Sequence, residues 1–262
     1  MRYLIEISYN GYAYVGWQRQ PNGLSIQEVL EDTMTLMLQE PVQITGCGRT
    51  DSGVHARHYF AHLDLAGDLP PRMIHRLNRM LPSDVVIHAI YQVPPDTHAR
   101  FDAVRRSYRY FMTLGKDPFS PHMAWHYPHA RHLDQEAMME VAAMLPAYSD
   151  FAPFCKTNHD AETTLCDLTT SRWFFMEDRW VYHVESNRFL RGMVRLIIGM
   201  CLEVGQGKLT VEEVDACFNE KRQVSRAWSV PPDGLYLDRV DYLDRKEWIL
   251  VDADPARLEQ QS

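Results

Sequence analysis

The alternation of apolar and polar residues predicts a mixed order of strands and helices. Period-two alternation, which is typical of half-buried strands, covers four N-terminal segments: 3–8, 42–45, 59–65 and 85–92. Helical spacing begins at Ser25, which with Glu28 forms a capping-box pattern, and again near Pro71. The first helix would bury one face, formed by Ile26, Val29, Leu30, Met34, Met37 and Leu38.

Pro94-Pro95 interrupts these patterns and predicts a boundary. Beyond it we expect strands at 107–114, 164–176, 180–185 and 235–240, and helices at 134–145, at 188–203 and after Thr210. A His-rich and Pro-rich loop runs to Arg131. The pattern predicts an α+β fold with an N-terminal half 1–95, a C-terminal half 96–243 and a solvated tail 244–262.

A glycine-bounded loop, Gly46–Ala56, lies between two of the predicted strands. It carries Arg49, Asp51 and His55, and glycine allows backbone conformations and close approaches that fix such side chains in place. Asp51-Ser52-Gly53 alone is more typical of a turn in which the carboxylate bonds its own backbone. The density of functional groups between the glycines favours a site, with Asp51 as the first candidate for chemistry.

Two later segments carry basic and aromatic side chains. On a strand, Arg106, Tyr108 and Tyr110 share one face, which suits stacking on an unpaired base and contact with a phosphate. The simpler interpretation is that Tyr108 is an ordinary half-buried strand tyrosine.

In the predicted helix 188–203, one sector of about 100° holds three arginines and two glycines: Arg188, Arg191, Gly192, Arg195 and Gly199. Glycine costs a helix about 1 kcal/mol relative to alanine, so we expect another backbone or a ligand to approach closely. Arg195 could pair with Asp51 and keep it ionised by lowering its pKa. The alternative is an exposed arginine face.

Composition limits the class of protein. The 262 residues are 45% apolar, enough for one large or two ordinary domains, and no apolar run reaches the length of a membrane span. Five scattered cysteines suggest free thiols, so we expect a cytoplasmic protein. The net charge is −8, but arginines are clustered at 72–79, 100–109 and 188–195, which leaves room for a basic nucleic-acid surface on an acidic body.

The chain resembles the tRNA pseudouridine synthase A family. Gly48–His55 matches its Gly-Arg-Thr-Asp-Ala-Gly-Val-His signature with Ser52 in place of Ala, Arg106–Tyr110 matches its basic-x-Tyr-x-Tyr strand, and Asn187–Arg195 matches its third motif. Further likenesses are Gly16–Gln20, His98–Phe101 and Pro231–Leu237, with Val230 where alanine is common. The likeness runs in order from Tyr3 to about Tyr242.

This resemblance implies two α/β halves whose mainly antiparallel sheets join into one extended sheet, with a catalytic cleft between the halves. It implies isomerisation of uridine to pseudouridine at positions 38, 39 and 40 of the tRNA anticodon stem-loop by a homodimer, without a cofactor. Tyr108 would stack on the target uracil, Arg195 would form a salt bridge with the catalytic Asp51, and Leu235 would border the base pocket. We expect Arg49 to fill the vacated space or grip a flanking phosphate.

Three alternatives stay open at this stage. His58 with His62, or the cluster His122, His126, His129 and His132, could bind a metal, although the first pair lies on a strand and the second lacks an acidic ligand. A lone aspartate would also serve a nucleoside N-glycosidase. The third alternative is a tRNA-binding protein without activity.

The chemical role of Asp51 also stays open. Asp51 could attack C1′, attack C6 or abstract the 2′ proton.

Overall fold

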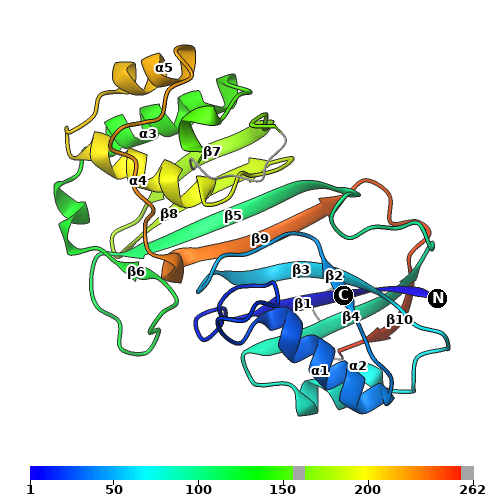
Figure 1. Cartoon of the computed structure of the whole chain (residues 1–262). Helices are drawn as coiled ribbons and strands as arrows, with labels where there is room; N and C mark the ends of the chain where they lie inside the picture. Colours follow the sequence, from blue (N-terminus) through cyan, green and yellow to red (C-terminus); the bar gives the residue numbers. More distant parts are fainter. Residues whose placement is uncertain (156–162, 255–262) are drawn as a thin grey trace. The chain divides into compact units, whose positions relative to one another are not determined.

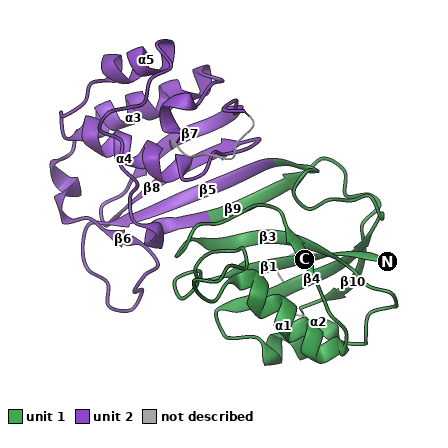
Figure 2. Ribbon diagram, in the orientation of Figure 1, with its two compact units in different colours: residues 1–104, 237–262 green, residues 105–236 purple. Residues whose placement is uncertain are grey.

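The computed structural model describes residues 1–155 and 163–254 and shows a mixed α+β fold whose sheet strands are mostly antiparallel (Figure 1). The predicted α+β class is confirmed. The described chain divides into two compact units (Figure 2): unit 1 is Met1–Val104 together with the chain from Leu237 on, and unit 2 is Arg105–Tyr236. No helix in the described ranges is long and apolar enough to cross a membrane.

The break between the units comes after Val104, whereas the sequence placed it after Pro95. Side chains of unit 1 hold the intervening segment in place. The Ala99 N–H donates to Nδ1 of His62 (3.1 Å), and the Tyr242 hydroxyl donates to the Ala99 carbonyl (2.6 Å). Because these contacts join residues that are distant in the chain, no local sequence pattern other than Pro94-Pro95 indicates where unit 1 ends.

Unit 1 is built on antiparallel strands in the order β10-β4-β1-β3, with β2 beside β3. Their bounds are β1 Arg2–Tyr9, β2 Ile44–Gly46, β3 His55–Asp64, β4 Val85–Val93 and β10 Ile249–Ala253. Ile5 of the central strand lies opposite Ala61 and Ile90, and all three are buried. Strand β9, Leu235–Tyr242, enters unit 1 at Leu237 and lies beside β3.

Two helices belong to unit 1, α1 (Ile26–Leu38) and α2 (Met73–Met80). The Ser25 hydroxyl accepts the Glu28 N–H (3.2 Å), so the predicted start of α1 is confirmed, while the Glu28 carboxylate pairs with Arg19 (3.4 Å). Ile26, Leu30 and Met34 are fully buried. Helix α2 begins two residues later than Pro71, after Arg72, whose φ is +55°.

Unit 2 contains the antiparallel strands β5-β8-β7, with the short β6 parallel to β5. The strands are β5 Ala103–Thr113, β6 Trp125–His126, β7 Leu168–Phe175 and β8 Arg179–Ser186, and the helices are α3 Gln135–Met144, α4 Met193–Gly205 and α5 Val211–Asn219. Short 3₁₀ turns lie at Pro128–His132, Leu145–Ala147, Ala152–Phe154 and Pro232–Gly234. Thr210 and Glu213 form the predicted capping box of α5.

Helix α4 begins at Met193, so the predicted helical start at residue 188 is wrong. Gly192 is the N-cap, with φ +72°, a left-handed conformation that glycine adopts without strain. Arg188 and Arg191 therefore precede the helix, and the basic helical stripe reduces to Arg195 together with Gly199. The apolar spacing of 189–193 continues that of α4, which is why periodicity alone missed the start.

Within the solvated tail predicted after residue 243, Ile249–Ala253 form strand β10, and their side chains are exposed or half-buried. Ile249 lies opposite Gln92 and Leu250 opposite Tyr91 of β4. A short strand flanked by charged residues resembles a polar tail until its partner strand is known. The remaining part of the predicted tail, 255–262, lies outside the described residues.

Candidate active site

The Asp51 loop joins β2 to β3 and rests on the loop that follows β1. The Trp17 N–H donates to the Thr50 carbonyl (3.2 Å), and the Gly53 N–H donates to the Tyr14 carbonyl (3.2 Å). The Val54 N–H donates to the Asp51 carbonyl (3.1 Å), so main-chain atoms close a turn at this point. Three main-chain bonds thus fix the backbone on both sides of Asp51.

Glycines outside the signature allow this contact between loops. A Cβ on Gly16, whose φ is +105°, would lie 2.4 Å from the Thr50 carbonyl oxygen, and a Cβ on Gly11 would lie 2.0 Å from that of Val54. Within the signature the glycines differ. Gly53 has φ +79°, whereas a Cβ on Gly48 would meet nothing within 4 Å. The sequence pattern marked the signature glycines but gave no such role to Gly11.

Buried side chains form hydrogen bonds with residues of the Asp51 loop. The hydroxyls of Tyr9 and Thr50 are 2.9 Å apart, and the Tyr59 hydroxyl donates to the Gly48 carbonyl (2.5 Å). Nδ1 of the buried His55 accepts the Gly11 N–H (3.1 Å). Because a ring nitrogen of His55 accepts a main-chain bond, this histidine has a structural role in the loop.

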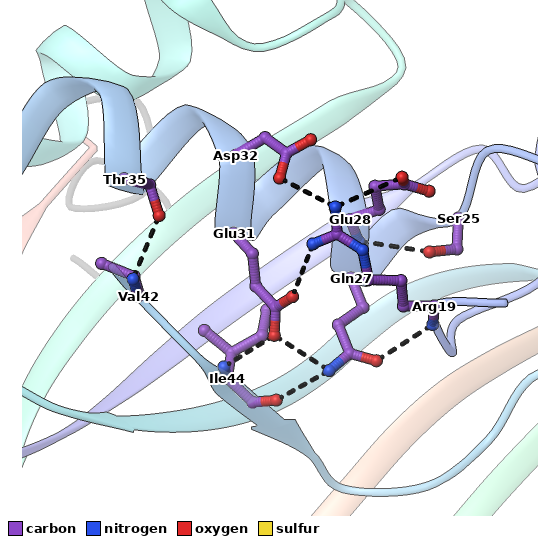
Figure 3. A network of polar contacts seen from close by, with 9 residues as sticks. All are labelled: Arg19, Ser25, Gln27, Glu28, Glu31, Asp32, Thr35, Val42 and Ile44. Atoms are coloured by element: carbon purple, nitrogen blue, oxygen red, sulfur yellow. Dashed lines mark hydrogen bonds and ion pairs between the residues drawn. The ribbon is translucent and has the colours of Figure 1, made fainter. Parts of the chain in front are cut away.

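The outer edge of β2 is held by α1 rather than by another strand (Figure 3). Glu31 accepts the Ile44 N–H (3.0 Å), and the side-chain amide of Gln27 donates to the Ile44 carbonyl (3.1 Å) and to Glu31 (3.0 Å). The second oxygen of Glu31 pairs with Arg19 (3.3 Å). The buried carboxylate of Glu31 and the half-buried amide of Gln27 thus substitute for a neighbouring strand directly before the Asp51 loop.

Asp51 is half-buried in this rigid setting, and Arg49 is exposed on the same loop. The Ser52 hydroxyl donates to the Tyr14 carbonyl (3.2 Å), so the serine that replaces the family's usual alanine adds one more bond to the loop. The loop presents a carboxylate from a fixed backbone, with a guanidinium two residues away.

In unit 2, Tyr108 lies on β5 opposite Val184, half-buried, with its ring edge-on to Phe189 (5.1 Å between centroids). Tyr110, on the same face, is fully buried, and its hydroxyl donates to the Pro231 carbonyl (3.0 Å). Burial raises the pKa of Tyr110 well above its usual value. Tyr110 is therefore a core tyrosine, whereas Tyr108 keeps part of its surface accessible.

Arg195 lies in the first turn of α4. Its Nε donates to the Val230 carbonyl (2.6 Å), and the Val230 N–H is 3.4 Å from the Arg195 carbonyl. A Cβ on Gly199 would lie 1.9 Å from the Trp228 carbonyl oxygen. The predicted close approach of another backbone is confirmed at Gly199.

Leu235 is buried at the start of β9, directly after Gly234. A Cβ on Gly234 would lie 2.4 Å from the Phe111 carbonyl oxygen. The segment 228–235 thus contacts α4 through Trp228 and Val230, and it contacts β5 through Pro231 and Gly234. The sequence analysis did not predict that one segment contacts both α4 and β5. Gly234 is the residue in the sequence that could have indicated such a close contact.

Of the histidines considered as metal ligands, His58 and His62 have other partners. His58 accepts the Val240 N–H (3.1 Å) and lies 3.0 Å from the buried Glu6 carboxylate. Burial, together with the charge of Arg2, lowers the pKa of His62 to about 4. Within the described ranges no three His, Cys, Asp or Glu side chains are grouped to hold a metal ion.

Comparisons with known proteins agree on one family. A family model described as tRNA pseudouridine synthase matches residues 145–243. The tRNA pseudouridine synthase A of Porphyromonas gingivalis is 41% identical over 246 residues, 92% of this chain and 97% of that protein. That of Parabacteroides distasonis is 41% identical over 244 residues (92% and 96%), and that of Chlorobaculum tepidum is 38% identical over 240 residues (91% and 96%).

Proposed function

We propose that this chain, which belongs to the tRNA pseudouridine synthase A family, isomerises uridine to pseudouridine at positions 38, 39 and 40 of the tRNA anticodon stem-loop. The observation that carries the proposal is the likeness to synthases of this name over nine-tenths of both chains. The Asp51 loop supports it, because its backbone is fixed by bonds from Trp17, Gly53 and Val54.

The reaction breaks the bond between ribose C1′ and uracil N1, turns the base and joins C1′ to C5. The proton on C5 leaves, and N1 gains one, so no oxidant, water or group donor is consumed. Asp51 is the essential carboxylate, which attacks C1′, attacks C6 or removes the 2′ proton. All three routes need an ionised carboxylate beside the sugar.

Arg195 is proposed to pair with Asp51 and keep it ionised. Its Nε is bonded to the Val230 carbonyl, so the orientation of the guanidinium plane is set within unit 2, and the Nη end is the part that would bind a carboxylate. An arginine fixed in this way loses little side-chain freedom when it forms the pair.

The remaining residues are proposed to bind the displaced nucleotide. Unstacking a base costs a few kcal/mol, and stacking on an aromatic ring recovers about 1–3 kcal/mol. Tyr108 supplies that ring, and its edge-on contact with Phe189 limits how the ring can turn. Leu235 borders the base, and Arg49, exposed on the Asp51 loop, contacts a flanking phosphate or fills the vacated space.

The working form is proposed to be a cytoplasmic homodimer. Light scattering at assay concentrations tests the assembly, and a monomeric mass would refute it.

Release of tritium from tRNA labelled at uridine C5 tests the function. The parent should release tritium from positions 38–40, and Asp51→Ala should release none at equal tRNA binding. Asp51→Asn, which keeps the shape of the side chain, should also be inactive. If the parent binds tRNA without releasing tritium, the enzyme proposal is wrong. Free uracil among the products would show an N-glycosidase instead.

A further inference from the structure

Helix α2 of unit 1 exposes a basic face. Arg72, His75, Arg76 and Arg79 are all exposed, while Met73, Ile74 and Leu77 are buried. At about 100° per residue the three basic positions within the helix, His75, Arg76 and Arg79, fall within an arc of about 100°, and Arg72 is the N-cap. We call these four residues the α2 basic face.

The α2 basic face lacks the acidic partners that some other exposed arginines have. Arg57 pairs with Asp238 and Arg239 with Asp241, at 3.4 and 3.0 Å. Within residues 1–155 and 163–254, no ion pair or side-chain hydrogen bond involves any side chain of the face. In a chain of net charge −8, three neighbouring arginines without an ion pair to the described residues make this a distinct surface.

This arrangement opposes the stability of the helix. Arg76 and Arg79 lie three residues apart on the helix, and Arg72 at the N-cap precedes Arg76 by four residues, so these like charges repel. Arg72 also places a positive charge at the helix N-terminus, which the helix dipole disfavours, and does so at φ +55°. A helix of eight residues gains little from its own propensity, so a folding advantage does not explain the face.

Residues from elsewhere in unit 1 hold α2 in place. Asp252 of β10 accepts the Ile74 N–H (2.9 Å) and so supplies the missing cap. Asn78 exchanges two hydrogen bonds with the main chain of Ile87, both 2.9 Å long. Asp68 and Asp252 line one pocket with Arg72, which weakens the positive charge at that end. Arg76 and Arg79 are therefore the strongest part of the face.

The Arg79 end of α2 is connected to the Asp51 loop. The chain continues from α2 to Asp84, which accepts the Tyr14 hydroxyl (2.6 Å) and the Asn10 N–H (2.9 Å). The Tyr14 carbonyl in turn holds Gly53 and Ser52. From Arg79 the face extends along the helix for about 10 Å, at 1.5 Å per residue.

We propose that the α2 basic face binds phosphates of the tRNA backbone away from the target nucleotide. This inference rests on the proposed function, since it extends the same substrate across unit 1. An acidic body repels a polyanion unless local positive charge compensates, and arginine binds phosphate in a bidentate geometry. The ordered link from Arg79 to the Asp51 loop keeps such contacts in register with the reacting uridine.

The test measures tRNA dissociation constants for a double variant, Arg76→Gln with Arg79→Gln, across a range of salt concentrations. Each phosphate contact contributes about 1 to the slope of log Kd against log salt, so the slope should fall by about 2. Affinity at low salt should weaken on the order of tenfold, and the loss in tritium release should appear in KM. Arg76→Lys with Arg79→Lys should keep most of the slope.

The control is Arg131→Gln with Arg179→Gln, which removes the same charge from two exposed arginines of unit 2. Thermal unfolding verifies folding, and the α2 variant should be at least as stable as the parent because a repulsion is removed. If the α2 variant has the same tRNA affinity and salt slope as the control, the proposal is wrong. The face would then bind an acidic protein or no partner. If the proposed function itself is wrong, the parent protein will release no tritium, and this result is distinct from a change in tRNA affinity.

Discussion

Replacing Gly199 by alanine sets the helix propensity of α4 against its packing. In a free helix alanine is favoured over glycine by about 1 kcal/mol. In this fold the added Cβ would lie 1.9, 3.0 and 3.1 Å from the carbonyl oxygen, carbonyl carbon and amide nitrogen of Trp228. All three are backbone atoms, so the clash cannot be relieved by turning a side chain.

The Trp228 backbone is not free to retreat. The Trp228 indole N–H donates to Glu203 (3.1 Å), and Val230 is bonded to Arg195. Overpacking costs about 1–3 kcal/mol, and each bond lost by a shift costs about 1 kcal/mol. After the gain in helix propensity, we expect a net destabilisation of about 2 kcal/mol, which corresponds to a fall of about 4–8 °C in the thermal midpoint.

Activity should respond as well, because moving Val230 moves the acceptor that orients Arg195. With the proposed role of Arg195, tritium release at 25 °C, where Gly199→Ala is still folded, should fall on the order of tenfold. Circular dichroism on heating and the tritium assay measure the two effects on the same preparation.

Gly205→Ala is the matched control in the same helix. Its added Cβ would lie 2.8 Å from Cγ and Sδ of Met138 and 3.2 Å from Cβ of Leu133, and these side-chain atoms can shift more easily than the Trp228 backbone. We expect a change in midpoint of less than about 2 °C for this control. If Gly199→Ala proves as stable as the parent or more so, helix propensity dominates and the packing argument is wrong.

Three further outcomes are expected. Gly53→Ala, which forces alanine to φ +79°, should lower stability by about 1 kcal/mol or more and reduce tritium release. Gly48→Ala, with open space at its Cβ, should leave stability unchanged. Urea unfolding of the two variants measures this difference. Glu31→Ala should cost about 2–3 kcal/mol in urea unfolding, because the Ile44 N–H loses its acceptor inside the protein, and an unchanged value would contradict the role given to this carboxylate. His62 has a native pKa of about 4, below its unfolded value of about 6.5, so its contribution to stability is complete above pH 6.5 and is lost as the pH falls toward 4; His62→Asn should flatten this part of the urea-derived stability curve, and parallel curves would refute the assignment.

Local signals in the sequence were sufficient for the parts of the fold that local bonds determine. Ser25 and Thr210 cap their helices as their side chains predict. The Asp51 loop lies between two strands because alternation on both sides fixes its ends. The N-terminus of α4 was missed because the positive φ of Gly192 leaves no trace in the spacing of apolar residues.

Contacts between distant segments account for the rest. The role of Gly11 depends on Val54, and the role of Gly199 depends on Trp228; neither partner is near in sequence. Residues 249–253 form a strand because they pair with β4. A short apolar segment shows no clear preference for a strand until a partner strand is present. Candidate chemistry could be predicted from residue types, whereas the anchors that position it are long-range.

The hydrogen bond from Ile74 to Asp252 spans 178 positions of the chain, and this separation constrains the order of events during synthesis. Domains generally fold as units while the ribosome proceeds from the N-terminus. Unit 1 cannot be completed in that way, since its strand β10 follows the whole of unit 2 in the chain. A nascent or prematurely released chain that stops before Ile249 leaves the β4 edge bare and α2 uncapped. Such a chain exposes a strand edge that promotes aggregation until β10 has been synthesised and pairs with β4.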